Sequence, residues 1–272
     1  MLTSFHSESS SKSNPSERRT IVDCPATVTE IWDMTPTVKS LNLFVNQYQF
    51  LDYKAGQWLE FKIPELKRMG SFTMCTSPLK FKKTGNIQLA VKYSDHKPTA
   101  WVHTNCKVGH QITISFGGDF HYNPTVDDPT HDLLLIGGGI GVNPLFCIMN
   151  LIADYNVMNK ENNSRCYQPG NVQLLYSVRT VNDIQFKDNL EKLENENENI
   201  SCKFFVTKEK PNDKNIINRR INSEDIKEAL QKLDRGNCYI YICAPGEMMD
   251  DMEEILEDME FDSSKIRTGR WW

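Results

Sequence analysis

The chain has 272 residues, which is enough for one large domain or two of ordinary size. Hydrophobic residues at 39% and charged residues at 25% are normal for a soluble globular protein. The net charge of −5 provides no general attraction to nucleic acid or to a membrane surface, so we expect neither as a partner. The eight cysteines form no C-x-x-C pair, so we expect no metal site. Free thiols in a reducing compartment, cytoplasmic or mitochondrial, are the favoured interpretation.

The first 20 residues are rich in serine and end with Arg18 and Arg19. A mitochondrial presequence has this bias towards Arg and Ser, but it is poor in acidic residues, and Glu8 and Glu17 weaken that interpretation. We therefore predict a disordered tail over residues 1–20.

Residues 21–125 contain short runs of β-branched and aromatic residues separated by turn signals such as Lys54-Ala55-Gly56. The expected strands cover residues 27–32, 38–45, 57–63, 71–74, 87–93 and 111–116, and one short helix is expected near Thr99. Closely spaced strands with few helical patterns predict a small antiparallel barrel.

After a polar, proline-bearing connection over residues 123–132, strands and helices alternate. The expected strands cover residues 133–136, 172–176, 203–206 and 239–242. The expected helices begin near Leu145, extend over about 182–193, begin again near Ser223, and extend over about 247–259. This alternation predicts a parallel sheet with helices on both faces, which binds ligands at the carboxyl ends of its strands.

The segment IGGGIGVNPL, residues 136–145, joins the first of these strands to its helix. Its glycines allow positive φ and close approach of a ligand to the backbone. Asn143 suits an N-cap and Pro144 the first helical position, and a helix start with free N–H groups is a site for anions, most often phosphate. A tight turn with glycine only for packing explains an isolated run of this kind about equally well. A membrane span over residues 133–152 is a further alternative, which the glycines, Asn143 and Pro144 argue against.

Three further segments, together with this one, form a set of four motifs in a fixed order along the chain. They are KAGQW at 54–58, GSFTMCTS at 70–77 and CAPGEM at 243–248, and the chain ends on an aromatic pair. Together they resemble the ferredoxin–NADP reductase superfamily of flavoenzymes over residues 25–272, most closely its branch of oxidoreductase NAD-binding domain-containing proteins. The resemblance implies an antiparallel Greek-key flavin-binding β barrel over 21–125, followed by a doubly wound, parallel-sheet α/β nucleotide-binding domain over 130–272.

The resemblance implies FAD in the barrel, bound through the motif Arg-x-Tyr-Ser-x-x-Ser. Phe72 takes the Tyr place, where its ring can lie against the isoalloxazine, and the Thr73 hydroxyl can hydrogen-bond the N5 edge beside the reacting atoms. Gly70 replaces the pyrophosphate-pairing Arg, with Arg68 two residues earlier. Ordinary core-strand residues are the alternative for this segment. The implied flavin-binding residues are Phe72, Thr73, Met74, Cys75, Thr76 and, in a second motif that has lost its Gly at His96, Thr99.

The resemblance also implies a nicotinamide nucleotide in the second domain. Cys243 matches the Cys of Cys-Gly-Pro-x-x-Met, whose thiol lies beside the nicotinamide C4 in the family, and Ala244 replaces the Gly. A small buried residue at a strand end is the alternative for Cys243. Trp272 can stack on the flavin face where nicotinamide enters, or can simply anchor the last strand. The implied nucleotide-binding residues are Gly138, Gly139, Gly141, Val142, Asn143, Pro144, Cys243, Pro245 and Met248.

Three basic residues, Arg179, Lys208 and Arg220, occur where the adenosine end of the nucleotide is expected. Such a cluster can hold a 2′-phosphate, although solvated surface charge is the usual role of Lys and Arg. No acidic residue follows the second strand in the position that binds a free 2′-hydroxyl, which favours NADPH over NADH.

The sequence therefore predicts a flavin-dependent NAD(P)H oxidoreductase. A hydride would pass from the nicotinamide to FAD, with Cys243, Thr73 and Trp272 at the reacting centre. The chain contains no iron–sulfur motif, so the electrons would go on to a separate, unidentified acceptor. A redox-inactive nucleotide-binding sensor or partner-binding module on the same fold is the alternative, because Gly70, His96 and Ala244 depart from the family pattern.

Overall fold

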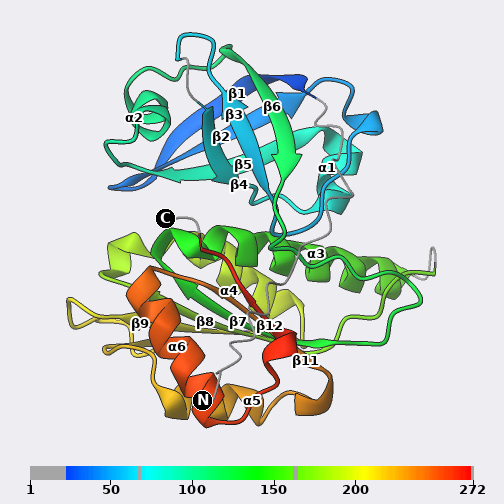
Figure 1. Cartoon of the computed structure of the whole chain (residues 1–272), viewed down its shortest axis with the longest axis vertical. Helices are drawn as coiled ribbons and strands as arrows, with labels where there is room; N and C mark the ends of the chain where they lie inside the picture. Colours follow the sequence, from blue (N-terminus) through cyan, green and yellow to red (C-terminus); the bar gives the residue numbers. More distant parts are fainter. Residues whose placement is uncertain (1–22, 67–68, 162–164, 271–272) are drawn as a thin grey trace, which may run out of the picture.

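Two six-stranded sheets form the framework of the computed structural model, which describes residues 23–66, 69–161 and 165–270 (Figure 1). The first sheet is antiparallel and the second is parallel with helices on both faces. The predicted fold class, an antiparallel barrel followed by a doubly wound α/β sheet, is confirmed.

The antiparallel strands close into a barrel in the order β4-β3-β6-β1-β2-β5. A bridge between Met74, which directly follows edge strand β4, and Leu89 of edge strand β5 joins the two edges. Inward side chains alternate along β3, where Leu59 and Phe61 are both fully buried. The bounds are β1 (Cys24–Thr35), β2 (Val38–Val45), β3 (Trp58–Lys62), β4 (Met69–Thr73), β5 (Asn86–Lys92) and β6 (Gln111–Gly117).

Two short helices complete the barrel. Helix α2 (Lys97–Thr104) is the one expected near Thr99, whereas α1 (Pro78–Thr84) was not predicted. The sequence contains the signals for α1: the Ser77 hydroxyl accepts a hydrogen bond from the Lys80 N–H at 3.0 Å, Pro78 opens the helix, and Gly85 ends it at φ 70°.

The parallel sheet has the order β10-β9-β8-β7-β11-β12. The chain order reverses between β7 and β11, so the crevice outside their carboxyl ends is a topological switch point. The strands are β7 (Asp132–Gly138), β8 (Val172–Val178), β9 (Ile200–Val206), β10 (Ile216–Ile217), β11 (Cys238–Cys243) and β12 (Ile266–Thr268). The helices are α3 (Val142–Glu161), α4 (Lys187–Glu196), α5 (Ser223–Leu230) and α6 (Gly246–Asp258).

The helix expected over 182–193 begins later than predicted, at Lys187. The Asp183 carboxylate accepts hydrogen bonds from the backbone N–H and the hydroxyl of Thr180, which closes a separate short turn over residues 181–183. Phe186 then adopts φ 57°, which separates this turn from α4.

Strand β7 buries side chains on both faces, which explains its continuous apolar run. Leu133 and Leu135 belong to the core that includes α3 and α4, whereas Leu134 and Ile136 pack with α5 and α6. Full burial of each such side chain stabilises the fold by about 1.5–3 kcal/mol. Val157, near the end of α3, is exposed.

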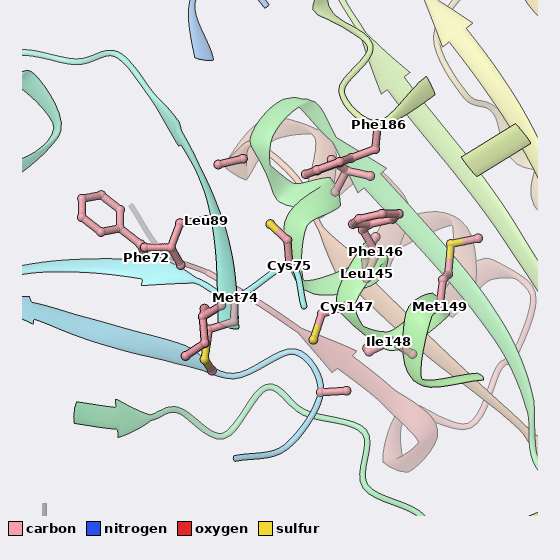
Figure 2. Packing of buried hydrophobic residues seen from close by; sticks show 14 of the residues in the cluster. Phe72, Met74, Cys75, Leu89, Leu145, Phe146, Cys147, Ile148, Met149 and Phe186 are labelled. Atoms are coloured by element: carbon pink, nitrogen blue, oxygen red, sulfur yellow. The ribbon is translucent and has the colours of Figure 1, made fainter. Parts of the chain in front are cut away.

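Helix α3 lies between the parallel sheet and the barrel (Figure 1). The Cys147 thiol donates to the Thr76 carbonyl at 2.9 Å, and the Asn150 amide donates to the Cys75 carbonyl at 3.1 Å. The Ser77 hydroxyl donates to the Asp154 carboxylate, whose pKa is raised by burial. Figure 2 shows the barrel segment that carries Cys75 beside Cys147 and its neighbours on α3. One continuous core therefore joins the two sheets and fixes the start of α3 against the barrel.

Candidate functional site

A cleft of about 540 Å³ lies at the carboxyl ends of the parallel strands. Its floor is the glycine segment that follows β7, and its walls come from the segments that follow β8, β9 and β11. The barrel supplies a further wall through Thr35, Thr37, Val38 and Lys92. The cleft thus occupies the switch point, where sheets of this kind bind ligands.

The glycines after β7 divide into two roles. A Cβ on Gly138 would lie 2.7 Å from both the Ala244 Cβ and the Pro245 Cδ, and a Cβ on Gly141 would overlap the carbonyl oxygen of Cys243. Both glycines therefore allow this loop to pack directly on the segment after β11. Gly139 differs, because it has φ +54° and a Cβ there would meet nothing within 4 Å. Its backbone lines the cleft and is open to a ligand.

Helix α3 begins at Val142, so Asn143 and Pro144 lie within its first turn and not at the N-cap and first helical position as predicted. All three residues are buried. The Asn143 side chain donates to the Ala90 carbonyl of the barrel at 2.9 Å. Asn143 therefore ties the glycine segment to the other domain.

Cys243 ends β11 opposite Gly137 of β7 and is fully buried. Pro245 and Met248, the other residues matched to the CAPGEM motif, line the cleft. The structure therefore brings the two motifs, more than 100 residues apart in the sequence, into direct contact at one sheet edge.

The three predicted cations also meet at the cleft. Arg179 and Lys208 are exposed there, and the Lys208 N–H donates to the Arg179 carbonyl at 2.8 Å, which holds the ends of β8 and β9 together. Arg220 instead pairs with two α6 carboxylates, Glu247 at 3.4 Å and Asp251 at 3.7 Å. Because both ion pairs are exposed to solvent, each contributes little to the stability of the fold. An incoming phosphate can therefore compete with the two carboxylates for the Arg220 guanidinium.

Two features of the cleft were not predicted. One is the barrel wall with exposed Lys92, which no pattern in the second domain could indicate. The other is Gln185, which lines the cleft although it is only 2% exposed. The Tyr176 hydroxyl donates to the Gly139 carbonyl at 3.1 Å and accepts from the Gln185 N–H at 3.3 Å, and burial raises the pKa of this tyrosine. The only sequence signal was a polar residue between apolar Ile184 and Phe186.

The expected flavin-binding residues lie apart from this cleft, in the barrel wall and at the contact with α3. Phe72 is 8% exposed, with its ring 5.4 Å from that of Phe61, and Figure 2 shows it directed away from α3. A Cβ on Gly70 would lie 2.7 Å from the Pro98 Cβ and 2.9 Å from the Phe72 ring. The strand therefore has no room for a larger side chain at position 70 without rearrangement.

Most of the remaining flavin-motif residues are buried or form hydrogen bonds within the barrel domain. Met74 and Cys75 are fully buried, and the Thr76 hydroxyl accepts from the Gln88 N–H at 2.8 Å. The Thr99 hydroxyl bonds the carbonyls of Ser94 and His96, while Thr73 is half-buried. The described residues do not include Trp272, Arg68 or residues 1–20. The roles predicted for them therefore stay predictions.

Within residues 23–66, 69–161 and 165–270, no helix combines the length and the apolar character needed to cross a membrane. The same ranges hold no cluster of three His, Cys, Asp or Glu side chains placed to bind a metal ion.

Residues 135–254 match the family model of the oxidoreductase NAD-binding domain. The chain is 34% identical over 253 residues to oxidoreductase NAD-binding domain-containing protein 1 of Danio rerio, covering 91% of each chain. The chain belongs to the oxidoreductase NAD-binding domain-containing protein 1 family.

Solved structures confirm that the chain has a ferredoxin reductase-like fold. The CS-b5R domains of human Ncb5or, in the NAD⁺ form, superpose with a TM-score of 0.73 at 19% identity, over 93% of the present chain and 71% of that one. The flavohem-like FAD/NAD-binding domain of nitric oxide dioxygenase from Vibrio cholerae superposes with a TM-score of 0.72 at 18% identity, over 91% and 98%. At this identity the superpositions show the fold of the chain alone.

Proposed function

We propose that the chain is a flavoprotein oxidoreductase that binds NAD(P)H in the cleft and passes its hydride to FAD and its electrons on to a separate acceptor. The observation that carries this proposal is the meeting of the glycine segment, the Cys243 segment and the basic residues in one cleft at the switch point. A nucleotide-binding role also agrees with the family model for residues 135–254.

The residues of the cleft fit a nicotinamide nucleotide. Gly139 offers open backbone at the start of α3, where N–H groups and the helix dipole favour a pyrophosphate. Arg179 and Lys208 supply cations for the phosphates, each charge-assisted bond being about twice as strong as a neutral one. Cys243, buried under the glycine segment, would position the nicotinamide, and the walls would exclude water from it.

The β4 residues do not fit FAD held in the family manner. Position 70 lacks the pyrophosphate arginine, and the contact between Gly70 and Pro98 leaves no space for one. FAD would supply the acceptor for the hydride when bound. Loss of one charged hydrogen bond weakens binding by about 1.5–3 kcal/mol, so we expect reversible flavin binding.

The closed contact at Gly70 also favours a second candidate function, a nucleotide-binding sensor or partner-binding module without redox activity. An absorbance spectrum of the purified protein, followed by FAD titration and anaerobic NADPH addition, separates the two. Bleaching of a bound flavin band by NADPH supports the oxidoreductase. Nucleotide binding without flavin uptake supports the sensor, and failure to bind either ligand contradicts both.

A further inference from the structure

An exposed aromatic turn lies on the side of the barrel that carries α1. The 3₁₀ turn η1 (Tyr48–Phe50) follows β2, and Phe50 within it is 87% exposed. Phe44 of β2 is also exposed, and its ring centroid lies 6.3 Å from that of the half-buried Tyr48. Scattered apolar side chains on a surface are ordinary, whereas aromatic rings gathered at one place indicate an interaction site.

The turn is held in a fixed position. Gln47 adopts φ 56° just before it, and the Gln47 carbonyl accepts from the Phe50 N–H at 3.0 Å. The Tyr48 ring packs against that of Phe81 in α1, with 6.1 Å between the ring centroids. Leu51, directly after the turn, is buried. Because burial of a phenylalanine side chain is favourable, a fixed turn that directs one into solvent indicates a surface that covers it.

Helix α1 places three exposed lysines beside this turn, namely Lys80, Lys82 and Lys83. The Lys82 Nζ lies 3.8 Å from the Asp52 carboxylate, which follows the turn, and this exposed pair contributes little. Asp52 is the only acidic residue between β2 and β3, and α1 contains none. The local charge is therefore positive, although the net charge of the whole chain is −5. The side chains of this surface, the Phe50–lysine patch, are Phe44, Tyr48, Phe50, Lys80, Lys82 and Lys83.

A bilayer with anionic headgroups fits both halves of the Phe50–lysine patch. An aromatic ring can enter the boundary between headgroups and acyl chains, while lysine ammonium groups on long stems reach the lipid phosphates and carboxylates. A protein partner would need a complementary surface of about 800 Å² around a central aromatic anchor. Phe50 instead stands on a turn of three residues, and a fluid bilayer can accommodate one projecting ring without such a surface.

We propose that the Phe50–lysine patch docks the protein reversibly on membranes that contain anionic phospholipids. Phe50 enters the headgroup layer, and the three lysines of α1 bind the negatively charged headgroups. The docking surface belongs to the barrel, on the side where α1 lies (Figure 1). This inference goes beyond the proposed nucleotide and flavin chemistry and does not depend on it.

The test is co-sedimentation of the full chain with sucrose-loaded vesicles. The wild type should bind phosphatidylcholine vesicles that contain about 30% phosphatidylserine and should not bind phosphatidylcholine alone. Raising the salt concentration from about 0.1 M to about 0.5 M should release it, because salt screens the lysines. Phe50→Ala should weaken the binding about tenfold, as expected for the loss of one buried phenylalanine ring. Lys82→Gln/Lys83→Gln should weaken it about five- to thirtyfold.

Matched controls come from the other side of the barrel. Val108 is 62% exposed and lies in the loop after α2, and Figure 1 shows α2 and α1 at opposite sides of the barrel. Val108→Ala and Lys97→Gln/Lys107→Gln should therefore leave vesicle binding unchanged. Because Phe50 is exposed, Phe50→Ala should melt at the wild-type temperature, so a loss of binding would not reflect unfolding.

Insertion of the turn has its own readout. The fluorescence of Phe50→Trp should be quenched by brominated acyl chains in phosphatidylserine-containing vesicles more strongly than that of the wild type, because the new indole enters the bilayer boundary. The quenching should disappear at high salt together with the binding.

Several outcomes would overturn the inference. They are a wild type that does not bind the anionic vesicles, equal binding to neutral and anionic vesicles, and wild-type binding by Phe50→Ala. Binding to soluble polyglutamate that the lysine variant loses, without vesicle binding, would assign the Phe50–lysine patch to an acidic protein instead. None of these results bears on nucleotide binding in the cleft, so failure here is distinguishable from failure of the proposed function.

Discussion

Gly141→Ala tests the packing between the two loops that form the floor of the cleft. A Cβ at this position would overlap the Cys243 carbonyl oxygen and lie 2.5 Å from its carbonyl carbon and 3.1 Å from the Ala244 nitrogen. All three are backbone atoms, so no rotamer change relieves the overlap and the loops must separate. Overpacking of this kind costs about 1–3 kcal/mol. For a chain of this length, that lowers Tm by about 2–5 °C.

The same displacement should weaken nucleotide binding, because it moves Gly139 and Cys243 relative to each other. Differential scanning calorimetry and titration with NADH measure the two effects. Gly246→Ala is the matched control: a Cβ there meets nothing within 4 Å, and the residue opens α6, where alanine is well tolerated. If Gly141→Ala melts and binds like the wild type, the two loops are not packed as described. A similar loss in Gly246→Ala would show that the effect is not specific to this contact.

Three further changes address chemistry, nucleotide choice and the domain contact. Cys243→Ala should slow flavin reduction by NAD(P)H about ten- to a hundredfold in stopped-flow experiments at unchanged flavin content, whereas an unchanged rate would indicate that Cys243 only packs. Arg179→Ala should lower kcat/KM for NADPH by about ten- to a hundredfold and affect NADH little, and equal losses would identify Arg179 as ordinary surface charge. Burial raises the pKa of Asp154, so its contribution to stability is present below the usual carboxyl pKa and is lost as the pH rises through the raised value. Asp154→Asn should therefore unfold at a higher urea concentration than the wild type at pH 7, and the gap should close towards pH 3; a gap that is constant with pH would contradict a buried, ionised carboxylate.

The fold was largely predictable because its elements carry strong local patterns. The apolar run over residues 133–136 indicated a strand buried on both faces, and β7 packs against helices on both sides. Shorter features were missed where local pairing decides the structure. The start of α4 depends on a turn closed by Asp183 and on the positive φ of Phe186, and neither follows from hydrophobic periodicity.

The sequence predicted only those residues of the cleft that directly follow a strand of the parallel sheet. Arg179 and Lys208 follow neighbouring parallel strands, so sheet topology alone brings them together. Lys92 lies at the cleft although it belongs to the barrel, because α3 packs against the barrel and brings the two domains together. No local sequence pattern predicts that contact.

Gly70 shows most clearly how packing changes the meaning of a substitution. From the sequence, glycine in place of the family's arginine is a missing contact, which a Gly70→Arg change would restore. In the structure, Pro98 and Phe72 occupy the space that any side chain at this position would need. The close approach of α2 to β4 at this position therefore depends on the absence of a side chain on residue 70. A Gly70→Arg change alone would therefore force Pro98 and Phe72 apart before the new side chain could reach a phosphate.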